Sequence, residues 1–300
     1  MENKDTIIIC DSTSDITPEI EKKLGIRIIN CFVEMDGLPY EERVDINTDK
    51  VYEYVEKTGK MPHHSQITVI RFVEEFMKAA RDGYKNILCV TMNKEGSGTY
   101  SAACNAIGLL YSEYPQFEGQ VNIRIIDSGT YSLGIANGIL IGVESLLNGE
   151  DFVTAGDLME DYFRNQITFV GLYSLKYAKK SGRLNAAAAI IGEALGIKPI
   201  LGIRGFNKVL EKARGDKNLI PKLVDMYFNM AEDPVNGNYV IAYGQDPKLG
   251  KELANAIHKK GGKMPLMSGQ VGTCVGTNSG PNMVGMGFRV KKGLPQLEEK

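Results

Sequence analysis

Short apolar segments alternate with helix-like segments through the first half of this 300-residue chain, and this alternation restricts the possible folds more than any other feature. The segments that we predict as strands are 6–10, 26–33, 87–92 and 121–127. Apolar residues recur at helical spacing in the segments between and after them, which are 69–80, 98–110 and 131–147. Strands that alternate with helices of this length predict a parallel sheet connected by crossover helices.

The second half also contains strand-like and helix-like segments, but their order and the turns between them differ from those of the first half. Its predicted strands are 166–172, 198–203, 207–212, 239–243, 272–275 and 283–290, and its predicted helices are 184–195 and 247–260. The polar stretch NGED near residue 150 marks a change between the two patterns. We therefore expect an α/β protein with two domains, 1–152 with a largely parallel Rossmann-like sheet and 153–300 with a mixed or antiparallel sheet.

Composition excludes several classes of function. The chain has 35 basic and 37 acidic residues and a net charge of -2, so nucleic-acid binding is not indicated. Its five cysteines show no C-x-x-C spacing, which argues against a zinc ribbon or a redox pair. The first residues pass straight into a strand-like run, and no apolar stretch approaches the length of about 18 residues that spans a membrane. We expect a cytoplasmic protein without stable membrane insertion.

Three polar loops follow directly after predicted strands. They are DSTSD at 11–15, NKEGSGTY at 93–100 and DSGTYS at 127–132. In a parallel sheet these loops lie on one edge, at the carboxyl ends of the strands, where ligands bind. Hydroxyl groups and the backbone N–H groups of helix starts suit an anionic or oxygen-rich ligand. The alternative is that the same residue types only cap the helices that follow them.

Familiar catalytic signatures are missing from these loops. The loop at 93–100 is neither G-x-G-x-x-G nor a G-x-S-x-G elbow, and the chain contains no G-x-x-x-x-G-K-[ST] motif. Only three histidines are present, and the adjacent His63 and His64 have no spacing typical of metal ligands. We expect no metal and no catalytic residues. A small-molecule transferase or a kinase-like α/β enzyme that uses the same loops remains an open alternative.

Two further segments bear on the ligand. A basic Lys-Ser-Gly-Arg turn at 180–183 precedes an alanine-rich helix whose apolar residues run almost all round it. Such a helix is either buried in the core or lines a narrow apolar cavity. Near the end, GTNSGPNMVGMGF at 276–288 places a Gly-Pro turn between two predicted strands, which allows the backbone to approach a ligand or the other domain closely.

Taken together, these motifs resemble the DegV family. The match runs along almost the whole chain, through DSTSD, an HSQ loop, SGTY, DSGTYSLG, KSGR, GIKPIL and a late G-T-x-x-G-P. The resemblance implies an EDD-type fold whose two domains enclose one long-chain fatty acid between them. Some members of the family present this fatty acid to an ATP-dependent fatty acid kinase, which makes an acyl phosphate for phospholipid synthesis.

On this resemblance the protein is a lipid-binding carrier without catalytic groups or a cofactor of its own. A lipid-responsive regulatory protein would share the same pocket and remains an open alternative. Arg183 matches an arginine near the expected contact with the kinase. The expected ligand-binding residues, several of them carried over from the family, are His64, Ser65, Ser97, Gly98, Thr99, Ser128 and Asn278.

Two positions depart from the family pattern. His64 stands where the family usually has threonine, and Asn278 stands where it usually has histidine. Both positions belong to the carboxylate site of the family. We hypothesise that the two changes compensate, so that the imidazole reaches the carboxylate from the loop of His64.

Overall fold

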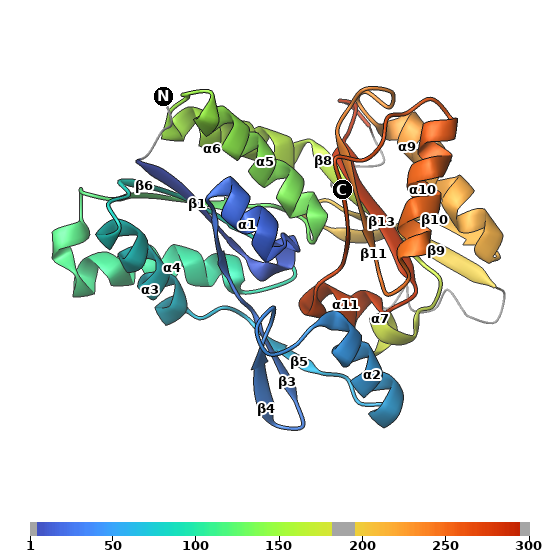
Figure 1. Cartoon of the computed structure of the whole chain (residues 1–300), viewed down its shortest axis with the longest axis horizontal. Helices are drawn as coiled ribbons and strands as arrows, with labels where there is room; N and C mark the ends of the chain where they lie inside the picture. Colours follow the sequence, from blue (N-terminus) through green and yellow to red (C-terminus); the bar gives the residue numbers. More distant parts are fainter. Residues whose placement is uncertain (1–4, 182–195, 295–300) are drawn as a thin grey trace.

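The N-terminal half is built on a four-stranded parallel sheet (Figure 1). The computed structural model describes residues 5–181 and 196–294. Its strands, in the spatial order β2-β1-β6-β7, are β2 (Arg27–Ile29), β1 (Thr6–Asp11), β6 (Asn86–Thr91) and β7 (Asn122–Asp127). Every pair of neighbours is parallel, which confirms the predicted Rossmann-like sheet. All six residues of β1 are buried, as expected for a strand that helices cover on both faces.

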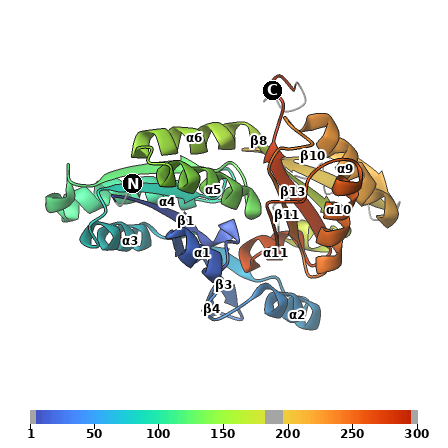
Figure 2. The same cartoon turned by 45° about the horizontal axis from the view of Figure 1, so that its top comes forward.

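Helices cover the two faces of this sheet (Figure 2). The helices α3 (Val69–Arg81) and α4 (Thr99–Glu113) pack together on one face, and α5 (Leu133–Leu147) and α6 (Phe152–Arg164) pack together on the other. Helix α5 is buried nearly all round because it contacts β1 of this sheet and also β11 and β13 of the second sheet. Helix α5 therefore packs against both halves.

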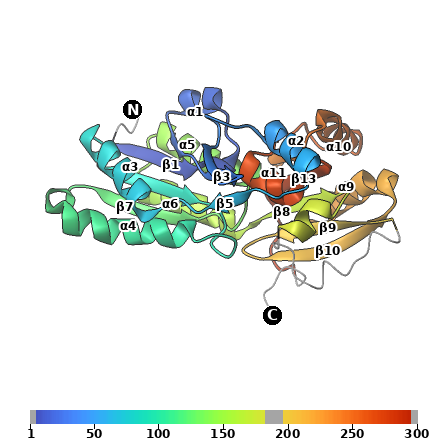
Figure 3. The same cartoon turned by 90° about the horizontal axis from the view of Figure 1, so that it is seen from below.

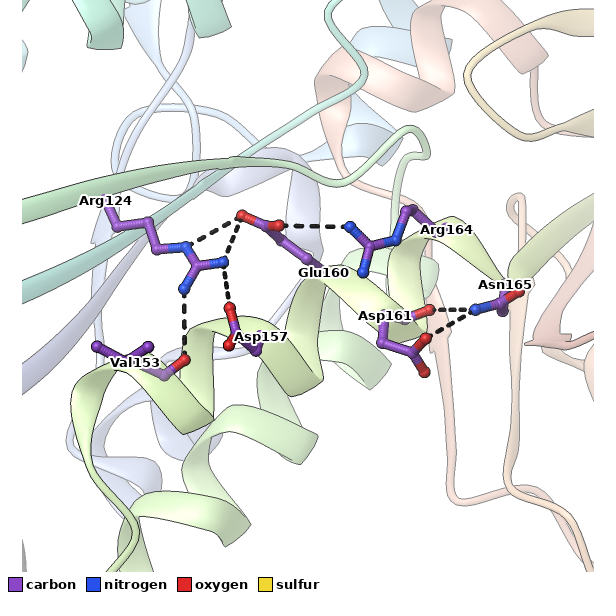
Figure 4. A network of polar contacts seen from close by, with 7 residues as sticks. All are labelled: Arg124, Val153, Asp157, Glu160, Asp161, Arg164 and Asn165. Carbon is purple, nitrogen blue, oxygen red and sulfur yellow. Dashed lines mark hydrogen bonds and ion pairs between the residues drawn. The ribbon is translucent and has the colours of Figure 1, made fainter.

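Helix α6 is tied to the first sheet by a polar network at the surface (Figure 4). Arg124, on β7, donates to Glu160 over 3.0 Å, to Asp157 over 2.7 Å and to the carbonyl of Val153 over 3.3 Å. The chain enters the second sheet at Gln166. By its packing α6 belongs with the N-terminal half, while the division at residue 152 stays a prediction.

The C-terminal half is built on a six-stranded mixed sheet. Its strands, in the spatial order β10-β9-β8-β13-β11-β12, are β10 (Asn207–Arg214), β9 (Ile197–Ile203), β8 (Gln166–Leu172), β13 (Met283–Arg289), β11 (Tyr239–Tyr243) and β12 (Met267–Gln270). Neighbours are antiparallel except for β11 and β12. This arrangement confirms the predicted mixed sheet, in which β9 and β10 form a hairpin.

The two faces of the second sheet have different roles, and β8 shows the difference. Ile167 and Phe169 belong to the core beneath α9 (Leu219–Met230) and α10 (Pro247–Lys259). Their neighbours Thr168, Val170 and Leu172 point to the opposite face, since successive side chains of a strand alternate. That opposite face looks toward the N-terminal half.

A small antiparallel sheet and a helix extend from the N-terminal half toward the C-terminal half (Figure 3). The strands, in the order β4-β3-β5, are β4 (Leu38–Glu41), β3 (Phe32–Met35) and β5 (His63–Ser65), and the helix is α2 (Thr48–Thr58). From α2, the hydroxyl of Thr48 donates to the carbonyl of Val271 over 2.8 Å, and that of Tyr52 donates to the carbonyl of Gly280 over 3.2 Å. Helix α2 therefore holds the two halves together.

Two sequence predictions of strands are wrong. The segment 26–33 is two strands, β2 and β3, which belong to different sheets and are separated at Asn30 and Cys31. The segment 272–275 begins a helix, α11 (Thr273–Ser279). Its residue types favour strands, but side chains of the N-terminal half bind the first backbone N–H groups and stabilise a helix instead.

The remaining described helices are short. Helix α1 (Pro18–Leu24) begins after Thr17, whose hydroxyl accepts from the N–H of Ile20, and ends at Gly25. Helix α7 (Lys176–Lys180) packs against α11. The predicted helix at 184–195 lies outside the described residues. Within 5–181 and 196–294, no helix combines the length and apolarity needed to cross a membrane.

Candidate functional site

A cavity of about 560 Å³ lies between the two halves. One wall consists of loops at the carboxyl ends of β1, β6 and β7, together with β5 and α11. The other wall is the face of the second sheet that α9 and α10 leave uncovered. The volume falls within the range of about 300–1,000 Å³ that is usual for small-molecule sites.

The three polar loops converge at this cavity, as the sequence predicted. The carboxylate of Asp11 accepts from the N–H of Met92 over 2.7 Å, which ties the first loop to the second. Asp127 accepts from the N–H of Lys94 over 3.1 Å, and the N–H of Ser132 donates to the carbonyl of Thr13 over 2.7 Å. The loops thus form one hydrogen-bonded group along one edge of the parallel sheet.

The glycines of the Gly-Ser-Gly loop permit close packing at the cavity. A side chain at Gly96 would overlap the hydroxyl of Tyr131, and one at Gly98 would overlap the amide of Gln66. All four residues line the cavity. Glycine at both positions lets the ends of the Tyr131 and Gln66 side chains pack closely against the loop, on either side of Ser97.

Five of the predicted ligand-binding residues come together in the cavity wall. They are His64, Ser65, Ser97, Gly98 and Asn278. They come from β5, the start of α4 and α11, which are far apart in the sequence.

Ser97 is already part of a local hydrogen-bonding arrangement at the start of α4. Its hydroxyl accepts from the N–H of Thr99 over 3.3 Å and lies 2.9 Å from the hydroxyl of Thr99. Thr99 therefore orients Ser97 while being fully buried itself and absent from the cavity wall. Its predicted contact with a ligand stays untested.

Another predicted ligand-binding residue, Ser128, is also absent from the described cavity wall. Ser128 is fully buried, and its hydroxyl donates to the carbonyl of Thr130 over 3.2 Å, so it stabilises its own loop. Arg183 lies outside the described residues. The roles predicted for these two residues remain predictions.

Asn278 faces the cavity with much of its hydrogen-bonding capacity in use. Its side-chain N–H donates to the carbonyl of Cys274, one turn earlier in α11, over 2.7 Å. The oxygen of the same amide is an acceptor, which a carboxylate cannot use. The second N–H of the amide is a donor that a carboxylate can use, so the hypothesis that the imidazole of His64 is the main side chain at the carboxylate position stays a prediction.

The opposite wall is apolar. It is formed mainly by alternate residues of neighbouring strands, which are Val170, Leu172, Leu201, Ile203, Ala242 and Met283. The apolar tunnel was expected in 153–300, but the sequence did not indicate these residues, because β8 is buried along its whole length and its two faces are similarly apolar. Side chains of a strand alternate between its two faces. When all of them are apolar, the sequence does not indicate which face meets a ligand.

Thr13 and Ser132 also line the cavity, although neither was selected from its loop. Ser132 has φ 57° and ψ -146°, a conformation that residues other than glycine rarely adopt. It is held there by the carbonyl of Thr13 and by the carboxylate of Asp15, to which its hydroxyl donates. Such strain is retained where surrounding contacts determine a backbone precisely, often at functional sites.

Three carboxyl groups lie behind the polar wall. Asp11 and Glu42 are 1% and 2% exposed, and Asp15 is partly exposed. Burial raises the pKa of Asp11 to about 7, and it raises the pKa of Glu42 above its usual range. Burial likewise raises the pKa of Asp15, and the charge of Glu42 adds to that effect. Most carboxylates of a protein surface are exposed to solvent, whereas these three groups lie next to a cavity.

The described residues offer little to hold a metal ion. No group of three or more His, Cys, Asp or Glu side chains in 5–181 and 196–294 is arranged for one. The arrangement suits an elongated, mainly apolar molecule with one polar end, because one wall presents hydroxyl, imidazole and amide groups and the other presents hydrocarbon.

Comparisons with known proteins agree with this fold. A family model described as "Uncharacterised protein, DegV family" matches residues 5–291. A DegV domain-containing protein from Clostridium perfringens is 30% identical over 283 residues, which are 94% of this chain and 97% of that protein.

Solved structures with a similar fold include two that are described by their lipid ligands. One is a DegV family protein from Thermus thermophilus described for fatty acid binding, with a TM-score of 0.84, 22% identity and coverage of 95% of this chain and 99% of that one. Another is a stearic acid-binding protein from Eubacterium ventriosum, with a TM-score of 0.83, 24% identity and coverage of 95% and 98%.

Proposed function

This chain belongs to the DegV family, and on that premise we propose that it binds one long-chain fatty acid in the cavity between its two halves. The observation that carries the proposal is the contrast between the two cavity walls, one polar and one apolar. Similar proteins from Thermus thermophilus and Eubacterium ventriosum are described as binding fatty acids, which supports the choice of ligand.

The energetics of a fatty acid match this contrast. Burial of each CH2 group contributes about 0.8 kcal/mol, so a long chain against the sheet face supplies most of the affinity. A buried carboxylate without hydrogen bonds would oppose binding, and charge-assisted bonds are the strongest available to it. In this proposal Ser97, the N–H of Gly98 and the imidazole of His64 bind the carboxylate.

We further propose that the protein acts as a carrier in the cytoplasm. It would present the carboxylate to a separate ATP-dependent fatty acid kinase and contribute no catalytic group of its own. This part of the proposal is supported by the family resemblance. Arg183 is the residue that we expect to contact the kinase.

Mass spectrometry tests the binding proposal directly. The protein is expressed in bacteria, weighed intact under native conditions and then extracted with organic solvent. We expect one long-chain fatty acid per chain, and we expect Ser97→Ala to reduce its occupancy because a hydrogen bond to a charged group is worth about 1.5–3 kcal/mol. Ser112→Ala, an exposed position on the same helix, is the matched control. An empty protein, or one that carries a polar metabolite, contradicts the proposal.

The carrier role needs a separate test. Protein loaded with radiolabelled oleate is incubated with ATP, alone and with a fatty acid kinase from the same organism. Acyl phosphate is expected only when the kinase is present. Formation of acyl phosphate by the protein alone would show that the chain is an enzyme.

A further inference from the structure

The carboxyl groups of Glu42 and Asp15 are bonded directly to the inner side of the polar cavity wall. Glu42 accepts from the N–H of Cys274 over 3.1 Å and from the hydroxyl of Thr273 over 2.6 Å. Asp15 accepts from the hydroxyl of Ser132. Cys274 and Ser132 both line the cavity, so a ligand at this wall is one residue away from each carboxyl group.

The predicted position of the ligand carboxylate is close to these two groups. Cys274 lies one turn before Asn278 in α11, which is about 6 Å along the helix axis. A carboxylate bound beside Asn278 would therefore enter a region that already contains Glu42 and Asp15. Like charges at such distances disfavour the ionised forms of both groups.

Positive charge near this region is scarce. Of the described residues that line the cavity, Lys94 is the sole lysine or arginine, and its amino group lies 3.8 Å from the carboxylate of Asp127. Arg43, next to Glu42 in the sequence, is ion-paired with Glu21 at 2.5 Å and donates to Asn30. Neither Glu42 nor Asp15 forms an ion pair within the described part of the chain.

The other titratable groups near the pair do not supply a counter-charge. Asp11, at the start of the loop that contains Asp15, is a third carboxyl group. Glu95 is a further one in the cavity wall. The thiols of Cys31 and Cys274 lie beside each other, and their contact together with burial raises the pKa of Cys31, which keeps it neutral. Tyr52 is likewise held neutral, because burial raises its pKa. His64 and Tyr131 are the remaining titratable groups among the described residues of the wall.

Glu42 can hold a proton when its hydrogen bond with Ser12 reverses direction. The hydroxyl of Ser12 donates to the second carboxyl oxygen of Glu42 over 2.5 Å and accepts from the N–H of Cys31 over 2.9 Å. A hydroxyl oxygen has two acceptor sites, so Ser12 can accept from protonated Glu42 while it keeps the bond from Cys31. The bonds from Thr273 and Cys274 reach the other oxygen of Glu42 and are unaffected.

We propose that Glu42 and Asp15 form a proton-binding site behind the polar wall, which takes up a proton when a fatty-acid carboxylate enters the cavity. This inference rests on the proposed function. The cavity then accepts a carboxylate together with a proton, so that the total negative charge does not increase. A headgroup with two negative charges, such as a phosphate monoester, is disfavoured by the same pair.

Calorimetry of the delipidated full-length protein measures the proton directly. Binding of dodecanoate is titrated at pH 7 in phosphate and in Tris, whose heats of ionisation differ, so that the difference in apparent enthalpy gives the number of protons exchanged. We expect uptake of about 0.5–1 proton per dodecanoate, and a loss of affinity of up to about tenfold per pH unit as the pH rises. Uncharged 1-dodecanol should bind with almost no uptake.

Variants test whether Glu42 and Asp15 bind the proton. Glu42→Gln imitates the protonated acid and should reduce the uptake with dodecanoate to near zero, and Asp15→Asn is a second variant should the first not fold. His64→Gln should retain the uptake, whatever its affinity. Glu42→Gln should also reduce the ratio of the affinity for dodecanoate to the affinity for dodecyl phosphate by about tenfold or more. The reason is that the variant removes the negative charge of Glu42 from behind the wall.

The outcomes separate this inference from the proposed function. Binding of dodecanoate by the wild-type protein without proton uptake would overturn the inference and leave the proposed function intact. Loss of the uptake in His64→Gln with full retention in Glu42→Gln would also overturn it. Failure of dodecanoate to bind at all would overturn both.

Discussion

The two walls of the cavity are built in different ways. The apolar wall is a continuous sheet face, and its residues Val170, Leu201 and Met283 come from adjacent hydrogen-bonded strands. The polar wall is assembled from loops, β5 and α11, whose residues approach from distant parts of the sequence. A regular sheet provides area for an alkyl chain, whereas separate loops provide individually placed hydrogen-bonding groups. Affinity and headgroup selectivity are therefore located on different structural elements.

A charge placed on the apolar wall should disturb the contrast between the two walls most. Val170→Asp should weaken fatty-acid binding by at least about 100-fold, because an uncompensated buried charge costs several kcal/mol. Bound lipid is quantified by extraction and mass spectrometry, and affinity by titration with dodecanoate.

Two controls accompany this variant. Val170→Ala should retain most of the binding, and Val44→Asp, at a side chain that is 67% exposed, should leave it unchanged. Unimpaired binding in a folded Val170→Asp protein would show that the chain does not lie on this wall.

The polar wall is tested by comparing two residues that face the same cavity. His64→Ala should weaken dodecanoate binding about tenfold, as expected for loss of one charge-assisted hydrogen bond. Asn278→Ala should have an effect of about threefold or less, because one of the two N–H donors of its amide is engaged with the carbonyl of Cys274. Equal and negligible effects of the two variants in the same titration would remove the hypothesis of compensation between these positions.

The pH dependence of stability separates the two walls further, since Asp11, Asp15 and Glu42 lie behind the polar wall and the described part of the apolar wall has no such acids. The pKa of Asp11 rises from 3.8 to about 7, and those of Asp15 and Glu42 also rise on folding. The folded protein then binds more protons than the unfolded chain, so the free energy of unfolding should fall as the pH rises through these raised pKa values.

Urea unfolding at pH 5, 6, 7 and 8 measures this fall. Each buried group contributes at most about 1.4 kcal/mol per pH unit. Glu42→Gln should flatten the profile, and the exposed control Glu34→Gln should not. A free energy of unfolding that rises over this range would contradict the assigned pKa shifts.

The smallest effect is expected far from both walls. Arg124→Gln removes the network that joins β7 to α6, and surface ion pairs contribute about 0–1 kcal/mol each. The thermal midpoint should fall by a few degrees at most, and binding of dodecanoate should not change. Lys85→Gln, which breaks an isolated exposed pair with Asp5, should have almost no effect on either quantity. A large loss of binding in Arg124→Gln would show that α6 positions the cavity.

The polar wall was more predictable from the sequence than the apolar wall. The loops around Ser97 and Thr13 follow strands of a parallel sheet, and topology alone brings such loops to one edge. Which face of β8 meets the cavity depends on where α9 and α10 pack, and that information is not local to Gln166–Leu172.

Helix α11 shows the same limit. Thr273, Cys274 and Val275 favour a strand by residue type, yet Glu42, 231 positions away from Thr273, helps to fix them as the start of a helix. The choice of Ser128 over Ser132 also depended on backbone geometry, since the two serines occur in the same loop and differ in which way they face.

A crystal structure with 16-bromohexadecanoate, phased to reveal the bromine by its anomalous signal, tests the central claim most directly. The account predicts a carboxylate within hydrogen-bonding distance of Ser97 and His64, and a bromine peak against the sheet face that contains Val170 and Leu201. A bromine beside the Gly96–Gly98 loop, or a carboxylate on the sheet face, would contradict it.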